Sequence, residues 1–248
     1  MQCSQSSNLC NGRNTPFSTN WMPMEEQMRN DEVKKYYKIL SKKKSALRIK
    51  RIADVFLAFI FMILLSPVMI FIACWIKIDS KGPVFYRQER ITSYGKPYRI
   101  FKFRTMVTGA DKKGPLVTEK SDSRITKVGQ KLRKLRLDEL PQLFNILTGD
   151  MTFVGTRPEV KKYVDCYTDE MQATLLLPAG ITSNTSIEYK DEDEIIDAYR
   201  AKGITDVDEI YLNYILPEKM KYNLKYIETF GFFSDMKIML RTAMAVIK

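Results

Sequence analysis

An uncharged apolar segment from Val55 to Ile76 constrains this chain more than any other feature of the sequence. Its 22 residues are enough for a helix to cross the hydrocarbon core of a bilayer, and too many for the core of a signal peptide. Ser66 and Pro67 lie in its middle, where proline removes a helical hydrogen bond. Both flanks are basic, with Lys42, Lys43, Lys44, Arg48, Lys50 and Arg51 before the segment and Lys77, Lys81, Arg87 and Arg90 after it.

Two arrangements of this segment are open. A straight helix would span the bilayer once, whereas a helix broken at Ser66 and Pro67 would enter one leaflet and return to the same side. The positive-inside rule favours the cytoplasm for both basic flanks, and only the second arrangement places them there together. The sequence therefore favours a re-entrant helix, in which neighbouring groups pair the backbone carbonyls that the break frees.

Composition limits what the rest of the chain can do. With 248 residues, 45% of them hydrophobic, the chain can bury one sizeable core, so we expect one globular domain with appendages. The absence of His excludes His-based triads and His metal sites, and leaves carboxylates, Lys, Tyr or Cys for catalysis. The four cysteines form no CxxC pair, so neither a zinc site nor a disulfide framework is expected.

Charge is distributed unevenly along the chain. The net charge is +11, and residues 34–104 hold 17 Lys or Arg against three acids, around the apolar segment. No nucleic-acid motif accompanies them, so they indicate contacts with anionic lipid head groups or polyphosphate substrates and no nucleic-acid partner. By contrast, residues 186–210 hold nine acids against three bases and are expected to form a solvated surface.

A pair of adjacent carboxylates, Asp138 and Glu139, stands at the start of a predicted short amphipathic helix that ends just before Gly149. Its apolar residues recur at helical spacing, at Leu140, Leu143, Phe144 and Leu147. A helix N-terminus has unpaired amides and partial positive charge, so it attracts a phosphate next to a carboxylate that can attack it. The pair is a candidate phosphoryl-transfer site, and the alternative is that Asp138 only caps the helix and Glu139 is a first-turn acid.

Four segments resemble those of the bacterial sugar transferases, also called monotopic phosphoglycosyl transferases, in order and approximate spacing. They are residues 82–88 (GPVFYRQ), 101–106 (FKFRTM), 122–126 (DSRIT) and the helix that starts at Asp138 and Glu139. The resemblance covers residues 48–248. It implies an α+β fold in a monotopic membrane protein, with a re-entrant membrane helix kinked at Ser66 and Pro67 and a compact cytosolic catalytic domain with interfacial amphipathic helices.

The resemblance also implies a reaction. Such enzymes move a sugar 1-phosphate from a UDP-sugar to polyprenyl (undecaprenyl) phosphate at the cytoplasmic face of the bacterial inner membrane. Asp138 would attack the phosphate that bears the sugar, expel UMP and hold the phosphosugar until the lipid phosphate takes it. This step initiates capsule, exopolysaccharide, O-antigen or glycoprotein assembly. The implied partners are the UDP-sugar donor, the polyprenyl phosphate acceptor and the lipid bilayer, with a homodimer left open.

Site residues follow from the same match. Mg²⁺ is the implied cofactor near Asp138 and Glu139, because an anionic nucleophile must approach an anionic diphosphate, and Glu139 is a candidate for proton transfer. Arg133 and Arg157 are the candidate phosphate clamps, since a guanidinium binds phosphate through two donors. Three further phosphate-binding candidates fit an ordinary strand or helix surface equally well: Gln142, Lys102 and Arg104.

The start of the membrane helix also matches the family. Lys50, Arg51 and Asp54 correspond to its charged residues there, and we expect them to fix the helix at the level of the head groups. Two departures concern the site: Thr156 replaces the first proline of the family's Pro-Arg-Pro turn, and Ala179 is an apparent insertion after Pro178. These departures bear on the rigidity of the turn and on the preference for sugar and nucleotide.

The chain divides into four expected parts. These are a polar, flexible extension (1–45), the re-entrant membrane helix (46–80), the catalytic core (81–190) and a helical C-terminal part (191–248). In the core, residues 84–88 and 98–105 predict a hairpin, 151–154 a strand and 109–123 a mobile loop near the site. The amphipathic end, Phe232 to Lys248, fits an interfacial helix and a helix packed on the protein's own core equally well.

Two other functions remain open. The fold could serve as a catalytically inactive membrane scaffold of a glycan assembly complex, which would tolerate Asp138→Asn. The chain could also be a single-span anchor with a basic cytosolic domain that binds acidic partners, which would place its two ends on opposite sides of the membrane.

Overall fold

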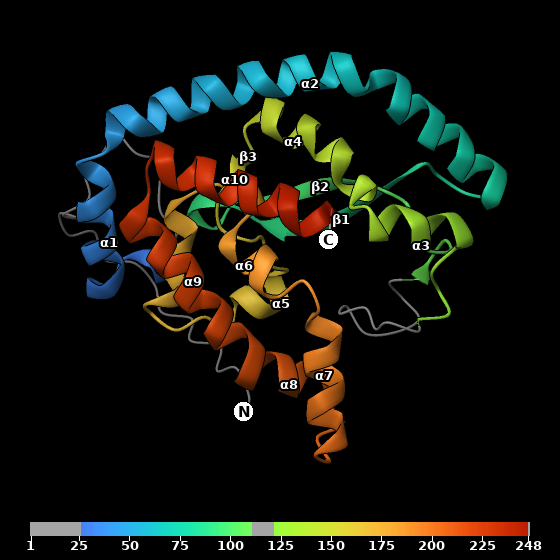
Figure 1. Cartoon of the computed structure of the whole chain (residues 1–248). Helices are drawn as coiled ribbons and strands as arrows, with labels where there is room; N and C mark the ends of the chain where they lie inside the picture. Colours follow the sequence, from blue (N-terminus) through green and yellow to red (C-terminus); the bar gives the residue numbers. More distant parts are fainter. Residues whose placement is uncertain (1–25, 111–121, 248) are drawn as a thin grey trace.

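The computed structural model describes residues 26–110 and 122–247, with side chains up to residue 245. Helices and sheet are mixed, which confirms the α+β class. Figure 1 shows α2 bowed over one edge of the domain and α7 at the opposite edge. The elements in chain order are η1 (Glu26–Met28), α1 (Asp31–Ser41), α2 (Lys44–Asp79), β1 (Phe85–Ile91), η2 (Ser93–Gly95), β2 (Pro97–Phe103), α3 (Lys127–Lys134), η4 (Leu137–Gln142), α4 (Leu143–Thr148), β3 (Met151–Val154), α5 (Lys161–Val164), η5 (Met171–Leu176), β4 (Ala179–Thr182), α6 (Asn184–Glu188), α7 (Glu192–Ala201), α8 (Val207–Ile210), η6 (Tyr211–Ile215), α9 (Leu216–Thr229) and α10 (Phe232–Ile247).

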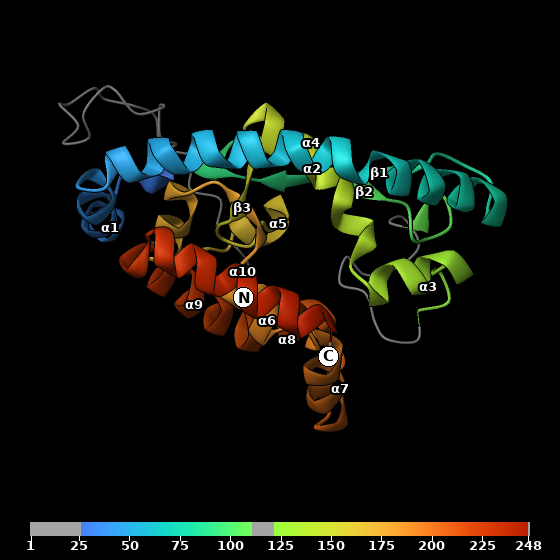
Figure 2. The same cartoon turned by 45° about the horizontal axis from the view of Figure 1, so that its top comes forward.

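The predicted hairpin is confirmed. Strands β1 and β2 pair antiparallel, with Phe85 opposite Phe103 and Ile91 opposite Pro97. The connection turns through Tyr94 and Gly95, both with positive φ (59° and 75°). Beside the hairpin lies α2, which crosses in front of it in Figure 2. The predicted loop over residues 109–123 lies largely outside the described residues.

A second sheet joins β3 to β4 in parallel. The predicted strand at 151–154 is confirmed as β3, and Met151 pairs with Ala179 of β4. Ala179 is therefore the first residue of β4, a strand that was not predicted from the sequence. Beyond β3 the two backbones approach closely, because a Cβ on Gly155 would lie 2.4 Å from the Pro178 carbonyl oxygen. Only glycine permits this approach.

The turn after β3 is held without the family's first proline. The carbonyl oxygen of Thr156 accepts a hydrogen bond of 2.8 Å from the Gly180 amide. The Thr156 hydroxyl donates to the Thr174 carbonyl oxygen at 3.3 Å, and the side chain is buried. These two bonds fix the residue that precedes Arg157.

Helix α2 is continuous from Lys44 to Asp79, with Pro67 inside it. The helix is not interrupted at Ser66 and Pro67, although it bows along its length (Figure 1), and the predicted kink and re-entrant course stay predictions. A proline at position 67 leaves the Ile63 carbonyl without its usual amide donor. The Ser66 hydroxyl donates to that carbonyl oxygen at 2.8 Å and replaces the missing bond.

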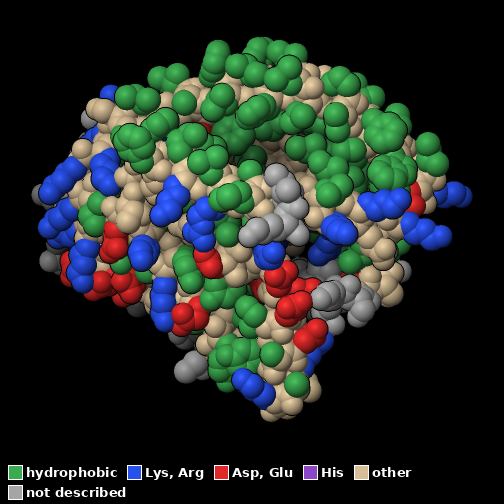
Figure 3. All heavy atoms as spheres, viewed as in Figure 1, with side chains coloured by type: hydrophobic (Ala, Val, Ile, Leu, Met, Phe, Trp, Pro, Cys, Tyr) green, Lys and Arg blue, Asp and Glu red, His purple; other side chains and the backbone are tan. Residues whose placement is uncertain are grey.

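Both halves of α2 pack against the same domain. In the N-terminal half Ala58 packs with Tyr98 and Ile146, and in the C-terminal half Ile72 and Ile76 pack with Phe103 and Leu132. The outward face is apolar and exposed, and Figure 3 shows hydrophobic side chains along this edge with Lys and Arg below them on both sides. Within the described residues α2 is the one helix long and apolar enough to cross a membrane, and 17% of its most apolar window is buried.

Helix α1 belongs to the domain core. Val33 and Leu40 have no exposed surface and pack with Leu176 and Ile227 of η5 and α9. Asn30 caps the helix by accepting a hydrogen bond of 2.8 Å from the Val33 amide. The prediction of a flexible extension over residues 1–45 was thus wrong for residues 26–45. A helix that is mostly polar can still pack on the core if one of its faces is apolar, as in α1. Residues 1–25 lie outside the described residues.

The C-terminal part is helical as predicted, and α10 has two apolar faces. Ile238 is buried in the core, while Phe232, Phe233 and Leu240 are 72%, 84% and 61% exposed. Packing on the protein's own core is confirmed for one face. Membrane contact by the other face stays a prediction, and Lys248 lies outside the described residues.

The cysteines differ in state. Cys166 is disulfide-bonded, which by itself makes no disulfide framework of the kind that the sequence was expected to lack. The spacing of cysteines along a sequence does not show which of them meet in space. Cys74 of α2 is free and exposed.

Candidate active site

The carboxylate pair lies in the first turn of η4, which leads directly into α4. Arg136, with φ 55°, is the N-cap residue, so Asp138 lies inside the helix and not at its cap as the alternative required. Gly149 ends α4 in the left-handed region (φ 94°), as predicted. Leu143 and Ile146 anchor the inner face of α4 in the core, which fixes the carboxylates relative to the domain.

Asp138 and Glu139 have different electrostatic environments. Asp138 is 8% exposed, and burial raises its pKa to about 6, with Lys102 opposing the shift and Glu139 adding to it. Burial alone would raise the pKa of Glu139 as well, but Lys102, Arg157 and Arg136 outweigh it and lower that pKa to about 2. Lys102 Nζ lies 2.9 Å from Glu139 Oε1. Glu139 is thus a fixed anion, and Asp138 is the carboxylate without an ion-pair partner at that distance.

Two arginines complete the cationic surroundings. Arg133 of α3 acts on Asp138 and lowers its pKa. Arg157 follows β3, and its Nη1 donates to Ser186 Oγ at 3.0 Å. Burial alone would lower the pKa of Arg157, but Glu139, Glu159 and Glu192 raise it. The structure therefore brings Asp138, Glu139, Lys102, Arg133 and Arg157 together, as the sequence predicted, and their roles stay predictions.

One cavity of about 1440 Å³ holds these groups. Asp138, Glu139, Lys102, Arg133 and Arg157 all line it. Its wall also includes apolar side chains of the long helix α2 and the C-terminal helix α10, namely Phe61, Leu65 and Ala245. The cavity therefore extends from the charged groups to apolar side chains of α2 and α10.

Two predicted phosphate-binding residues are buried. Arg104 is 4% exposed, and its guanidinium donates to the carbonyl oxygens of Lys81 and Ser80 at 2.8 and 2.7 Å. It joins the end of α2 to the end of β2 and also lines the cavity, so its role as a phosphate clamp stays a prediction. Gln142 is 2% exposed and is not among the residues that line the cavity. Arg104 was predicted from alternation along its strand, and Gln142 from its position one helical turn after Asp138. Neither pattern shows that these side chains are buried.

Gly82→Ala is expected to destabilise the protein, because the added Cβ would collide with the Arg104 side chain that joins the end of α2 to the end of β2. Gly82 has φ +129°, and a Cβ there would lie 2.0 Å from Arg104 Nη1 and 2.4 Å from Thr108 Oγ1. We expect a loss of about 1–3 kcal/mol in the free energy of unfolding beyond the loss for Gly203→Ala. Gly203 is the matched control because it also has positive φ (+94°) but open space around it. Equal losses in the unfolding of the two purified variants would contradict the role of Arg104.

The charged start of α2 faces the protein. Arg51 Nη1 donates to the Ile146 carbonyl oxygen at 2.6 Å and so caps the C-terminal end of α4. The buried Asp54 accepts a hydrogen bond from the Thr152 hydroxyl of β3. Lys50 Nζ lies 2.8 Å from Asp235 Oδ2 and 3.5 Å from Asp54 Oδ2. Each of the three residues thus joins the helix to the domain, and the expectation that they fix it at the level of the head groups stays a prediction.

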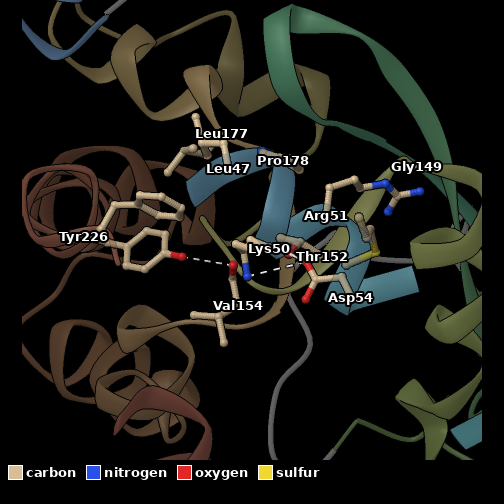
Figure 4. Close-up of a pocket in the computed structure, with 12 residues that line it drawn as sticks. Leu47, Lys50, Arg51, Asp54, Gly149, Thr152, Val154, Leu177, Pro178 and Tyr226 are labelled. Carbon is tan, nitrogen blue, oxygen red and sulfur yellow. Dashed lines mark hydrogen bonds and ion pairs between the residues drawn. The ribbon is translucent and has the colours of Figure 1, made fainter. Parts of the chain in front are cut away.

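Figure 4 shows this cluster at the junction of α2, β3 and α9. Tyr226 of α9 points toward it, with its hydroxyl 2.8 Å from Asp235 Oδ1 and 3.1 Å from the Val154 carbonyl oxygen. The same contacts reach α4 and β3: the carboxylate pair lies in η4, just before α4, and Arg157 comes just after β3. The start of α2 thus contacts the two elements that lead to the site.

A buried polar group on the wall of the cavity was missed from the sequence. Lys219 of α9 and Tyr211 of η6 are each 2% exposed, and Glu159 is 5% exposed. Tyr211 donates to Glu159 Oε1 at 2.7 Å, and Lys219 Nζ forms an ion pair with Glu192. No local motif marks these residues, because their partners lie on different elements. Glu192 falls in the acidic stretch that was expected to be solvated surface.

Comparison with known proteins places the chain in a family. The model of the bacterial sugar transferase family matches residues 45–248. A UDP-N-acetylgalactosamine-undecaprenyl-phosphate N-acetylgalactosaminephosphotransferase of Aeromonas hydrophila is 33% identical over 202 residues, which are 80% of this chain and 44% of that protein. A UDP-glucose:undecaprenyl-phosphate glucose-1-phosphate transferase of Klebsiella pneumoniae is 35% identical over 196 residues, 78% of this chain and 39% of that protein.

A third relative is closer in length. The uncharacterized sugar transferase EpsL of Bacillus subtilis is 32% identical over 200 residues, which are 80% of this chain and 87% of that protein. The chain thus spans less than half the length of the first two relatives and most of the third. The chain belongs to the bacterial sugar transferase family.

Proposed function

We propose that this protein transfers a sugar 1-phosphate from a UDP-sugar to undecaprenyl phosphate and releases UMP. The observation that carries the proposal is the pair Asp138 and Glu139 in a cavity that also holds Lys102, Arg133 and Arg157. Relatives named as undecaprenyl-phosphate sugar phosphotransferases support the donor and acceptor. Because the cavity wall includes Phe61 and Leu65 of α2, a lipid-linked acceptor can approach from the apolar edge.

The mechanism that we propose uses two displacements. The Asp138 carboxylate attacks the phosphorus that bears the sugar, a bond to UMP breaks, and UMP leaves with the electron pair. The phosphate of the lipid then attacks the same phosphorus, the bond to Asp138 breaks, and the carboxylate is restored. Covalent catalysis suits this pair of substrates, since the soluble donor and the membrane acceptor need not be bound together. A pKa of about 6 leaves Asp138 ionised at neutral pH.

The cations of the site have distinct tasks in this mechanism. Arg133 and Arg157 would bind the phosphate oxygens of the donor and offset their charge as Asp138 approaches. Lys102 pairs with Glu139 at 2.9 Å and offsets part of its charge beside the donor. Glu139 is ionised at neutral pH and lies next to the nucleophile, so its part in proton transfer would be that of an acceptor.

Mg²⁺ is compatible with the residues present. No group of three His, Cys, Asp or Glu side chains forms a complete metal site in the part of the chain that the structure describes. Asp138 and Glu139 offer two adjacent carboxylates, and Mg²⁺ commonly takes only one or two from the protein and completes its shell with phosphate oxygens and water. Asp138 and Glu139 would hold the ion, which when bound would neutralise charge on the diphosphate.

We further propose that α2 enters one leaflet and keeps both ends in the cytoplasm. At about 1.5 Å per residue its 36 residues extend roughly 54 Å, well beyond the hydrocarbon core. Both halves pack on one domain, so a perpendicular span would separate residues that are in contact. The exposed apolar face between basic flanks supports insertion to a shallow depth.

Cysteine labelling is expected to place both ends of α2 on the same side. Ser45→Cys and Ile78→Cys each put a thiol at an exposed position near one end, in a background whose four native cysteines are replaced by Ser. An impermeant maleimide should leave both unlabelled in intact cells and label both in inverted membrane vesicles. Labelling of one position only in intact cells would show a single span and contradict this arrangement.

The reaction itself is tested by release of UMP. Purified protein in nanodiscs with Mg²⁺ and undecaprenyl phosphate is incubated with a panel of UDP-sugars. Release with at least one donor, dependent on the acceptor, is the expected result. Failure with every donor from folded, membrane-inserted protein would favour the inactive scaffold.

A further inference from the structure

The cavity that holds the carboxylate pair is also lined by Tyr189, Glu192, Tyr211 and Lys219, from the end of α6, the start of α7, η6 and α9. A volume of about 1440 Å³ exceeds what a diphosphate alone requires. The same cavity therefore has room for more of a bound donor than its phosphates.

Lys219 is a buried cation with an organised set of partners. It is 2% exposed, its Nζ donates to the Tyr211 hydroxyl at 3.0 Å, and it forms an ion pair with Glu192 Oε2. Nζ also lies 4.6 Å from the centre of the Tyr211 ring. Tyr211 is fixed in turn by its bond to Glu159 and by stacking on Tyr163 at 4.4 Å. A buried ammonium persists only when it is paired in this way.

Glu192 is the member of this group that remains available to a ligand. Its side chain is 21% exposed and lines the cavity, and its Oε2 is engaged by Lys219. Among the described residues Lys219 is the cation that forms an ion pair with it. A carboxylate has about four lone-pair sites, so one that is held by a single ammonium still accepts hydrogen bonds from hydroxyl groups, as acidic residues do with the ribose of dinucleotides. Tyr189 adds an aromatic face beside it.

We propose that Glu192, anchored by Lys219 and flanked by Tyr189, is the specificity-determining residue that binds a vicinal diol of the sugar-nucleotide donor. The inference rests on the proposed function for the identity of the donor. The diol belongs either to the ribose of the nucleotide or to the transferred hexose. Arg157 lines the same cavity, and both Glu139 and Glu192 act on its guanidinium electrostatically, so one donor can reach Arg157 with its phosphate and Glu192 with its diol.

The test compares Glu192→Gln with wild type by equilibrium binding and by turnover. Calorimetry measures the affinity for UMP and for pairs of UDP-hexoses that differ at one hydroxyl, and so requires no catalysis. The matched control is Asp197→Asn, which removes a carboxylate from an exposed position of the same helix. Glu192→Gln removes the carboxylate that pairs with the buried Lys219, so the double variant with Lys219→Met, which removes the ion pair as a whole, is measured beside it, and thermal unfolding checks that both fold.

Glu192→Gln is expected to weaken donor binding by about tenfold or more, with the KM for undecaprenyl phosphate unchanged. Equal weakening for UMP and for every UDP-hexose identifies the ribose. Unchanged affinity for UMP with lost discrimination between the hexoses identifies the transferred sugar. Wild-type affinities and discrimination in folded Glu192→Gln would overturn the inference alone, whereas wild-type protein that binds neither UMP nor any UDP-sugar would overturn the proposed function as well.

Discussion

Asp138→Asn is expected to lower the rate of sugar-phosphate transfer by at least about 10³-fold, because the amide cannot form a bond to phosphorus and turn over. The substitution keeps the size of the side chain at a site that is 8% exposed, so the fold should persist. Loss of the nucleophile removes both displacements. The initial rate of UMP release with saturating donor and acceptor measures the effect, and binding of the donor should remain.

Asp165→Asn provides the control for this result. Asp165 pairs with Lys161 on the surface and does not line the cavity, so its substitution removes one carboxylate without touching the site. Its rate should equal that of wild type. A folded Asp138→Asn variant that keeps more than about a tenth of the wild-type rate would rule out Asp138 as the nucleophile.

Lys50→Met is expected to destabilise the protein by about 3–5 kcal/mol, the largest effect on stability that we predict. Lys50 is the ammonium between Asp54 and Asp235, which are 6% and 7% exposed. Without Lys50 the two buried carboxylates lose their compensating charge, and Asp54 keeps only the hydrogen bond that it accepts from the Thr152 hydroxyl. Chemical unfolding of the detergent-solubilised protein measures the loss.

Two further variants make this prediction specific. Arg48→Met removes an exposed cation from the same helix and should change the free energy of unfolding by less than about 0.5 kcal/mol. The double variant Lys50→Met with Asp235→Asn removes one of the stranded charges and should recover part of the loss. If Lys50→Met and Arg48→Met were equally stable, the ion pairs of Lys50 with Asp54 and Asp235 would contribute nothing to the stability of the fold.

Local patterns were sufficient for part of this fold. The hairpin of β1 and β2 and the end of α4 at Gly149 follow from strand periodicity and from glycine conformation, which depend on neighbours in the sequence. Asp138 and Glu139 were found because they are adjacent and precede an apolar helical pattern. Arg157 was predicted from its match to the family's turn, which follows the strand predicted at 151–154.

Long-range contacts explain what the sequence did not predict. Lys50 and Arg51 have the same appearance in the sequence as lysines and arginines that contact lipid, and only the fold shows that their partners are Asp235 and the carbonyls of α4. Lys219 is likewise an ordinary helical lysine until Glu192 and Tyr211 are placed beside it. Burial of a charge depends on partners far away in the chain, so composition and spacing cannot reveal it.

The covalent mechanism is tested most directly by the intact mass of the protein after incubation with a UDP-sugar donor in the absence of lipid acceptor. We expect an increase equal to one sugar phosphate, located on the peptide that contains Asp138, absent from Asp138→Asn and removed when undecaprenyl phosphate is added. Release of UMP that depends on the acceptor, with no adduct at any time during turnover, would contradict the covalent mechanism at Asp138.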